Sequence, residues 1–540
     1  MKKTSVLWAI IGITCSVCVT CSSIKEPAEV YTQPDYTAED VRREEIKRIQ
    51  DLRAQNSVQA LWRAHLLGDA QTLADCTDDV VSEYKKNLEE KNWFEARRLF
   101  NSLDAIGYTA LAALEKQRAE LDSLCMADVP GLAKKAVQKE KNATYISGTV
   151  TIWVDRGLKV QNGMGFADRV IGSGFFIAKD GYIVTNHHVI EDLVNPKYEG
   201  YARLFIKMAG DSDTRIPAKV IGWDPIVDLA LLKAEVDAPY VFTLGSSADL
   251  DVGDRIFAIG SPLGLESTLT SGVVSSIDRK LFTVGSVIQI DAAVNSGNSG
   301  GPCIDQNGAV QAIVFAGVLQ YEGLNFAIPV EYLKAELPAL YHGGKFEHPW
   351  LCAYGHTKKD MGKDTGLEVQ YVMPGGSLSR ANLLAGEVIT AVNGVRVATL
   401  EDMQRILFRC DAKSIVTVKT LSANGEEKTA AVYLATRPKN PGYTIYNNDV
   451  IASSFLSIFG MKLVHVSTAS SRKYAVQSII KGSIADETGF SENDPIDVMD
   501  VDFNDDKSAI YLTAYVKNSK KGYLDRSLGM GAPLDSPYFF

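Results

Sequence analysis

The sequence has few cysteines, and their positions do not suit a disulfide scaffold. Of eight cysteines in 540 residues, three (Cys15, Cys18 and Cys21) lie in the first 21 residues. The other five are an odd number spread along the chain, and none has zinc-site spacing. We therefore expect no disulfide-rich fold and no metal centre, and Cys303 is expected to be a small buried apolar residue.

Blocks of basic residues are also missing. The chain has 56 Lys and Arg against 66 Asp and Glu, for a net charge of −10. An acidic chain without a basic block argues against a nucleic-acid partner. The hydrophobic fraction of 46% and charged fraction of 23% are ordinary for globular domains, and the length requires several of them.

Long apolar runs are scarce, and the clearest one stands at the start. Lys2 and Lys3 precede the apolar stretch Val6–Val19, and Cys21 follows. This order is typical of an export signal over residues 1–21, with a linker over 22–37. Three alternatives remain open: a lipoprotein signal that ends in a lipidated Cys21, an uncleaved membrane anchor that is short for a full span, and an ordinary cleaved signal. Each predicts a location in the bacterial periplasm or cell envelope.

A glycine-flanked serine is the most informative feature of the chain. Ser299 lies in the stretch Gly297–Pro302, where glycines permit a tight turn and a close approach of substrate to the main chain. A serine hydroxyl needs a base, and a base needs an orienting acid. Histidines stand upstream in Thr185–Ile190, and aspartates stand in Asp224–Leu232. The order His, Asp, Ser is that of chymotrypsin-like proteases, and the combination predicts a nucleophilic triad.

The stretch from Gly172 to Pro329 resembles the protease domain of the HtrA family, also called Deg or protease Do. The shared pieces are Gly-Ser-Gly-Phe, Thr-Asn-x-His-Val, Asp-Leu-Ala-Leu-Leu-Lys, Ala-Ile-Gly-Ser-Pro-Leu-Gly, Thr-Ser-Gly-Val-Val-Ser and Gly-Asn-Ser-Gly-Gly-Pro. The resemblance implies a serine endopeptidase with two six-stranded β-barrels, no cofactor, and assembly into homotrimers.

Catalytic roles follow from the resemblance, position by position. His188 is the base because it precedes Val189, and His187 fills a variable slot. Asp228 is the orienting acid, whereas Asp224 fits only a turn. Ser299 is the nucleophile, and the N–H groups of Gly297 and Ser299 form the oxyanion hole.

Substrate preference is read from the residue six positions before the nucleophile. In chymotrypsin-like proteases this residue forms the floor of the S1 pocket, and here it is Ala293. Without an acid there, a substrate Arg or Lys would be buried unpaired, so we expect small or medium apolar side chains at P1.

We expect three further segments around the protease domain, which is placed at 143–340. Residues 38–140 have helical periodicity and form either a bundle or spacer or a faint tetratricopeptide unit. Residues 156–169 are expected to form a loop. Two PDZ-like α+β domains follow, at 345–440 and, in divergent form, at 448–540.

The two PDZ-like domains differ in the loop that captures a peptide carboxylate. That loop normally carries an apolar-Gly-apolar run. The first domain has Cys352 in place of the glycine, whereas the second keeps Phe459, Gly460 and Met461. We therefore expect peptide C-termini to bind mainly to the second domain; the alternative is that both domains are spacers.

Taken together, these features predict an exported serine endopeptidase that cleaves unfolded or mislocalised envelope proteins under PDZ control. Two alternatives remain: a regulatory protease that cuts one membrane substrate, and a chaperone or scaffold with an idle protease domain. Cleavage of a denatured generic substrate, with and without C-terminal peptides, separates the three.

Overall fold

The structure is a computed structural model. It describes residues 31–540 apart from 133–136, 138, 162, 196–197, 199, 212, 262–267, 281–284, 296, 318–323, 467–471 and 517–525. The expected export signal and the Pro262–Gly264 part of the family motif lie outside the described residues. Among the described residues, no helix has the length and apolar character needed to cross a membrane.

The N-terminal segment is helical, as its periodicity predicts. Its helices are α1 (Glu39–Arg53), α2 (Ser57–Leu67), α3 (Ala70–Glu89), α4 (Trp93–Ala105), the 3₁₀ turn η1 (Leu111–Ala113) and α5 (Arg118–Ala127). Asn56, Asp69 and Asn92 accept hydrogen bonds from the first turns of α2, α3 and α4. Gly68 ends α2 in the left-handed conformation.

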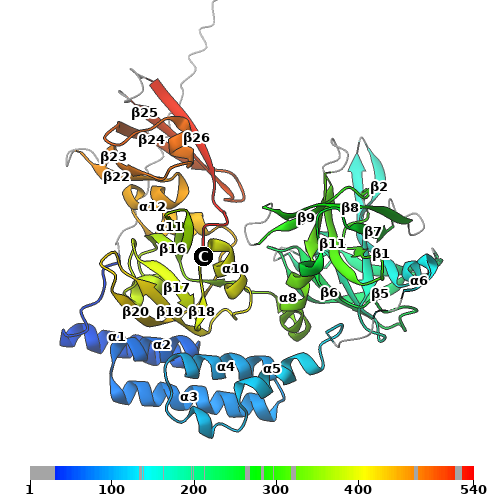
Figure 1. Cartoon of the computed structure of the whole chain (residues 1–540), viewed down its shortest axis with the longest axis horizontal. Coiled ribbons are helices and arrows are strands. Elements are labelled where there is room, and N and C mark those ends of the chain that lie inside the picture. Colours follow the sequence, from blue (N-terminus) through cyan, green and yellow to red (C-terminus); the bar gives the residue numbers. More distant parts are fainter. Residues whose placement is uncertain are drawn as a thin grey trace, which may run out of the picture. The chain divides into compact units, whose positions relative to one another are not determined.

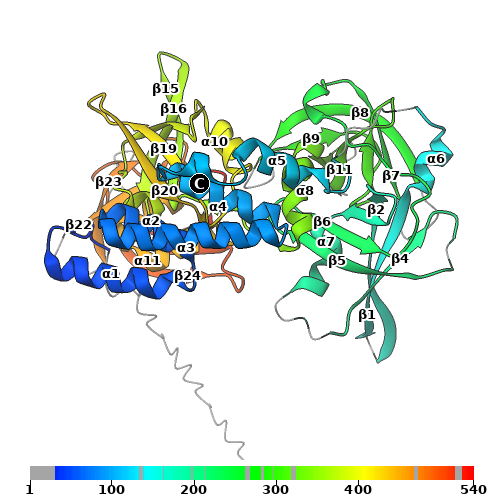
Figure 2. The same cartoon turned by 90° about the horizontal axis from the view of Figure 1, so that it is seen from below.

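These helices pack against the first PDZ domain. The indole of Trp62 stacks on Tyr433 at 5.6 Å between ring centroids and donates to the carbonyl of Ala431. Ala431 and Tyr433 belong to β20 (Glu427–Tyr433). Figure 2 shows α2 and α4 alongside β20 and β19 (Ile415–Leu421). Buried side chains of both segments form one apolar cluster. The helical segment thus shares a core with a PDZ domain.

The protease domain consists of two six-stranded β-barrels, as expected (Figure 1). In the first barrel, the pairing of β5 with β6 closes the order β5-β4-β1-β2-β3-β6. The second barrel has the order β10-β11-β12-β9-β8-β7. The first barrel contains β1 (Thr149–Gln161), β2 (Met164–Phe176), β3 (Tyr182–Thr185), β4 (Arg203–Met208), β5 (Ile216–Asp224) and β6 (Leu229–Ala234); the second contains β7 (Arg255–Gly260), β8 (Thr268–Arg279), β9 (Val287–Ile290), β10 (Pro302–Ile304), β11 (Val310–Gly317) and β12 (Asn325–Pro329).

Among the described residues, three α-helices, a 3₁₀ turn and one short strand complete this domain. Helix α6 (Asn142–Ser147) precedes β1, α7 (His187–Val194) follows β3, the 3₁₀ turn η2 (Ser247–Asp249) precedes β7, and α8 (Val330–His342) follows β12. After α8, β13 (Gly344–Lys345) pairs in parallel with β5.

The expected loop over residues 156–169 is wrong. These residues form the outer half of a long antiparallel hairpin between β1 and β2. Glycines indicate a loop here, but Gly157 directly follows a bulge at Arg156 and Gly163 lies in the tight turn, both with positive φ. Between these two glycines, Leu158–Gln161 alternates apolar and polar residues along β1.

The first PDZ domain is built on β15-β16-β17-β19-β20, with β15 at the edge of the sheet. Its elements are β14 (Pro349–Trp350), β15 (Ala353–Asp360), β16 (Lys363–Val372), α9 (Ser377–Arg380), β17 (Val388–Val392), β18 (Val395–Arg396), α10 (Leu400–Leu407), β19, β20 and β21 (Ala435–Thr436), followed by α11 (Pro441–Asn448).

The second PDZ domain is a separate compact unit over Asp449–Pro533. It contains α12 (Ile451–Ile458), β22 (Met461–His465), β23 (Lys473–Ile479), α13 (Ile484–Thr488), β24 (Pro495–Phe503), β25 (Ala509–Val516) and β26 (Arg526–Pro533), in one five-stranded sheet. The last residues, Leu534–Phe540, return to the larger unit that holds the helices, the barrels and the first PDZ domain.

Candidate active site

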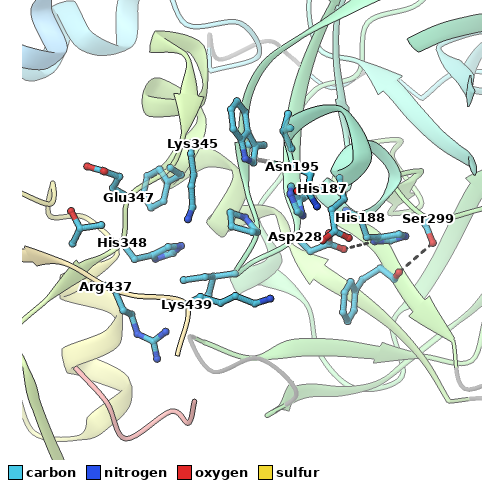
Figure 3. A pocket seen from close by; sticks show the side chains of 18 of the residues that line it. His187, His188, Asn195, Asp228, Ser299, Lys345, Glu347, His348, Arg437 and Lys439 are labelled. Atoms are coloured by element: carbon cyan, nitrogen blue, oxygen red, sulfur yellow. Dashed lines mark hydrogen bonds and ion pairs between the residues drawn. The ribbon is translucent and has the colours of Figure 1, made fainter. Parts of the chain in front are cut away.

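A histidine–aspartate pair lies at the start of α7. The Nδ1 atom of His188 is 2.6 Å from Oδ2 of Asp228, and the other carboxylate oxygen accepts the His188 backbone N–H at 2.7 Å. The His188 side chain is 43% exposed, whereas that of Asp228 is 10% exposed. One edge of the imidazole is thus fixed, and Figure 3 shows His188 between Asp228 and Ser299.

The turn between β5 and β6 positions Asp228. Asp228 has φ of 63°, a left-handed conformation that costs free energy in a residue with a Cβ. Hydrogen bonds hold it there: the Asn186 side chain donates to its carbonyl oxygen, and the buried Asp224 carboxylate accepts the backbone N–H groups of Ile226 and Val227. Asp224 therefore has the turn-stabilising position that the sequence indicates.

The Asp228 carboxylate changes the proton affinity of His188. Partial burial of the imidazole lowers its pKa, but the hydrogen bond to Asp228 and the negative charge of that carboxylate raise the pKa above its usual value of 6.5. The pKa of the neighbouring His187 is lowered, chiefly because burial disfavours its charged form.

The turn that carries Ser299 is close-packed against the first barrel. The backbone N–H of Ser173 donates to the Ser299 carbonyl at 2.8 Å, and the Ser173 hydroxyl donates to the Gly297 carbonyl at 2.6 Å. A Cβ on Gly300 would lie 2.3 Å from the Ser173 carbonyl oxygen, and a Cβ on Gly301 would lie 2.0 Å from that of Ile259. Lack of space therefore requires glycine at both positions.

The Ser299 hydroxyl donates a hydrogen bond to the Phe315 carbonyl at 3.3 Å. Backbone N–H groups around it are divided between two roles. Those of Asn298, Gly300 and Gly301 donate to the carbonyls of Asn295, Val314 and Asn298. No described residue accepts a hydrogen bond from the N–H of Gly297 or of Ser299.

A cavity of about 1020 Å³ contains His188, Asp228 and Ser299. Val294, Asn295 and Phe315 line the cavity near Ser299: the first two are close to it in sequence, and the third accepts its hydrogen bond. Ala293, the expected S1 residue, is exposed, and its neighbour Val294 lines the cavity instead. The far wall comes from outside the barrels, and its residues are Lys345, Phe346, Glu347, His348, Thr436, Arg437 and Lys439 (Figure 3). Sequence reasoning missed this wall because no motif marks it.

Asp224, four residues before Asp228 in the β5–β6 hairpin, forms a second histidine–aspartate pair with His348. Nε2 of His348 is 2.7 Å from Oδ2 of Asp224, with side-chain exposures of 3% and 0%. Glu336 of α8 is also fully buried beside them. Burial and the negative charge of Asp224 raise the pKa of Glu336 well above its usual value, which favours its protonated form. The three residues join β5, α8 and the segment before the first PDZ domain.

The carboxylate-binding loops of the two PDZ domains have the same backbone conformation at their central residue. Cys352 has φ of 63° and Gly460 has φ of 79°. A Cβ on Gly460 would lie 2.1 Å from that of Ser483, and the flanking Phe459 and Met461 are buried. The first loop thus adopts the left-handed turn although Cys352 replaces glycine, so the missing glycine does not prevent this backbone conformation.

Four family models match separate parts of the chain. A trypsin-like peptidase domain matches residues 172–313, and a PDZ domain matches 353–421. A TP0546 family PDZ domain matches 442–534, and a domain of unknown function, DUF8517, matches 40–125.

Curated proteins similar to this chain include "Protease Do-like 1, chloroplastic" of Arabidopsis thaliana, which is 36% identical over 284 residues, 48% of this chain and 62% of that protein. A "Probable periplasmic serine endoprotease DegP-like" of Halomonas elongata is 34% identical over 282 residues, 50% of this chain and 57% of that protein. These matches support a protein of the HtrA/Deg type, with a trypsin-like domain and PDZ domains.

The chain spans only about three-fifths of the length of the first of these relatives. Among solved structures, "HtrA-type protease AlgW with decapeptide" aligns over 55% of this chain and 99% of its own, with 24% identity and a TM-score of 0.46. The trypsin-like and PDZ models match the protease domain and the first PDZ domain, whereas the other two family models match the second PDZ domain and the helical segment.

Proposed function

We propose that this protein is a serine endopeptidase in which His188, Asp228 and Ser299 form the catalytic triad. The observation that carries the proposal is the His188–Asp228 pair, which is joined by two hydrogen bonds and shares one cavity with Ser299. Asp228 fixes the tautomer with the proton on Nδ1, so Nε2 is left as the base.

The reaction begins when the Ser299 hydroxyl turns from the Phe315 carbonyl towards His188. Nε2 takes the hydroxyl proton as Oγ attacks the scissile carbonyl carbon, and a tetrahedral adduct forms. The adduct collapses when His188 returns that proton to the leaving amine. Water then attacks the acyl ester in the same way, with His188 again as base, and releases the second product.

Backbone donors stabilise the negative oxygen of the adduct. Gly297 and Ser299 are proposed as the oxyanion hole, supported by their N–H groups having no described protein acceptor. No cofactor takes part in this scheme, and Ser173 is a positioning residue because it holds the carbonyls of Gly297 and Ser299.

We propose a preference for small or medium apolar side chains at P1. The uncharged side chains of Val294 and Phe315 line the cavity near Ser299, and the expected S1 residue Ala293, also uncharged, is exposed beside Val294. A buried substrate cation would find no carboxylate at this position.

Substrates are proposed to be unfolded or mislocalised proteins of the bacterial periplasm or cell envelope. The export-like sequence of residues 1–21 and the word "periplasmic" in the names of several relatives support this location. Membrane attachment through residues 1–21 is part of the same proposal, and incorporation of labelled palmitate at Cys21 tests its lipid form. Peptide capture by Phe459, Gly460 and Met461 in the second PDZ domain is a further part.

We also propose a homotrimer assembled through the protease domains. Four apolar side chains of the β1–β2 hairpin are between 49% and 77% exposed: Leu158, Val160, Met164 and Phe166. Exposed apolar side chains gathered on one hairpin are typical of an association surface. Light scattering should give a trimer for the natural chain and a monomer for Leu158→Glu/Phe166→Glu; a monomeric natural chain would disprove the trimer.

Ser299→Ala tests the central proposal. The variant keeps the turn, since a methyl replaces a hydroxymethyl, and it should lose cleavage of unfolded casein by at least about 10³-fold. Ser275→Ala, which changes a half-buried serine on β8, serves as the matched control. Cleavage by Ser299→Ala at the rate of the control would rule out Ser299 as nucleophile.

A further inference from the structure

The last residues of the chain form an extra strand on the first PDZ domain. Tyr354 of β15 pairs with Phe539 in an antiparallel bridge. Ala353 and Phe540 exchange two backbone hydrogen bonds of 3.1 Å, and Gly355 donates to the carbonyl of Tyr538 at 3.2 Å. Because β15 is the edge of its sheet, its free N–H and C=O groups are a template for an added strand.

The C-terminal side chains are buried in this position. Phe540 is 2% exposed and belongs to the same apolar cluster as Leu351, Leu378 and Met403 of the first PDZ domain. Phe539 is 4% exposed, and the space left beside the two rings is only about 20 Å³. Two aromatic side chains are therefore removed almost completely from water, which is a large favourable contribution.

Polar contacts fix the residues before the two phenylalanines. Gln404 of α10 donates from Nε2 to the Pro537 carbonyl at 2.9 Å. Arg437 binds the Asp535 carboxylate through both terminal nitrogens, and its side chain is 2% exposed. The Tyr538 ring lies 4.0 Å from the His356 ring, centroid to centroid. Both walls of the groove, β15 and α10, thus contact the same segment.

The loop at the end of the groove has the conformation that peptide capture requires. Cys352 adopts φ of 63°, and its carbonyl accepts the Met373 N–H at 2.9 Å. The next N–H, that of Ala353, donates to the carbonyl oxygen of Phe540. The carbonyl group of Phe540 therefore lies at the mouth of this loop.

We propose that the chain's own tail, Ser536–Phe540, is a resident ligand that blocks the groove between β15 and α10. A foreign peptide C-terminus with two aromatic residues then binds there only by displacing the tail. The inference does not rest on the proposed protease activity, because the contacts that carry it lie outside the triad.

Fluorescence anisotropy with a labelled peptide tests the proposal. The probe is Leu-Asp-Ser-Pro-Tyr-Phe-Phe with a free carboxylate, and the proteins are the full chain and a chain lacking residues 537–540. Deletion should tighten the apparent Kd at least tenfold, and the amidated peptide should lose most of that binding. Equal affinity for both proteins, or equal binding of the acid and the amide, would overturn the proposal.

Two further variants assign the binding to this groove. In the shortened chain, Gln404→Ala should weaken peptide binding several-fold because it removes the donor to the Pro537 carbonyl. Arg405→Ala, on the same helix but 66% exposed, is the matched control and should leave binding unchanged. Loss of binding on Gly460→Ala but not on Gln404→Ala would place the site in the second PDZ domain and refute the assignment. In the full chain, Phe540→Asp should open the groove as the deletion does.

Discussion

Two histidine–aspartate pairs lie at the two ends of one short turn, and they differ mainly in exposure. His188 and Asp228 face the cavity, with the imidazole 43% exposed, whereas His348 and Asp224 are 3% and 0% exposed. The N···O distances are nearly equal, at 2.6 and 2.7 Å. The same imidazole–carboxylate contact can thus orient a catalytic base in the exposed pair and hold distant segments together in the buried pair.

The difference lies in what the free edge of each imidazole meets. His188 faces a cavity that also contains Ser299, so a proton can move between it and a substrate. His348 lines the far wall of the same cavity but is only 3% exposed, with Phe346 and Phe408 rings at 4.7 and 5.5 Å. A buried pair is costly to break but not available to a substrate. Substitutions in each pair should therefore separate catalysis from stability.

The largest effect is expected from Asp228→Asn. An asparagine keeps the shape but favours the wrong imidazole tautomer, so kcat should fall by about 10⁴-fold. Steady-state cleavage of an apolar fluorogenic peptide measures this, and thermal unfolding should stay nearly unchanged as the control. A loss below tenfold would remove Asp228 from the catalytic group.

Asp224→Asn should show the opposite pattern. His348 loses a charged partner in a buried site, so the free energy of unfolding should fall by about 3 kcal/mol. Urea unfolding measures the loss, and kcat of the folded fraction at low temperature should stay within about tenfold of the natural chain. A catalytic loss without destabilisation would identify Asp224, in place of Asp228, as the catalytic acid.

The pH dependence of cleavage should report His188. Its neutral form is the base, and its pKa is raised above 6.5, so kcat/KM should rise with pH and level off above that raised pKa. Below it, kcat/KM should fall about tenfold per pH unit. An inflection below pH 6.5, with circular dichroism showing folded protein throughout, would contradict the assignment.

The smallest effect is expected from Glu336→Gln. In the folded chain Glu336 holds a proton that the unfolded chain releases above about pH 4.5, so stability from this group is lost as pH rises from 4.5 towards the raised folded pKa. Glutamine avoids this loss, and the free energy of unfolding at pH 8 should increase by about 1 kcal/mol. At pH 4 the two proteins should be alike, which is the internal control. A variant less stable than the natural chain at pH 8 would show that Glu336 is charged.

The sequence was sufficient to predict the architecture and the candidate triad because both depend on local patterns. Gly297–Pro302 and the turn before Leu229 have short-range signatures, and the barrels follow from recurring strands and turns. The β1–β2 hairpin was missed because Gly157 and Gly163 resemble loop residues until the pairing partner is known.

What the sequence did not reveal depends on contacts between distant segments. Nothing near His348 indicates that Asp224, 124 residues earlier, would be its partner. Cys352 suggested a disabled loop because glycine is usual there, but Cys352 adopts the left-handed backbone, with φ of 63°, and buries its side chain against Ser377. The packing of Trp62 on β20 and of Phe540 on β15 likewise joins residues hundreds of positions apart.

One hydrogen bond near the tail has a consequence for competition. The Gly442 N–H donates to the Leu534 carbonyl at 2.8 Å, so the chain is fastened just before its last six residues. Those residues therefore search a small volume, and a short tether gives an effective ligand concentration on the order of millimolar. A foreign C-terminus of equal intrinsic affinity would have to reach a similar local concentration to displace the tail. The first PDZ groove would then respond to accumulation of such ends, and stay closed to rare ones.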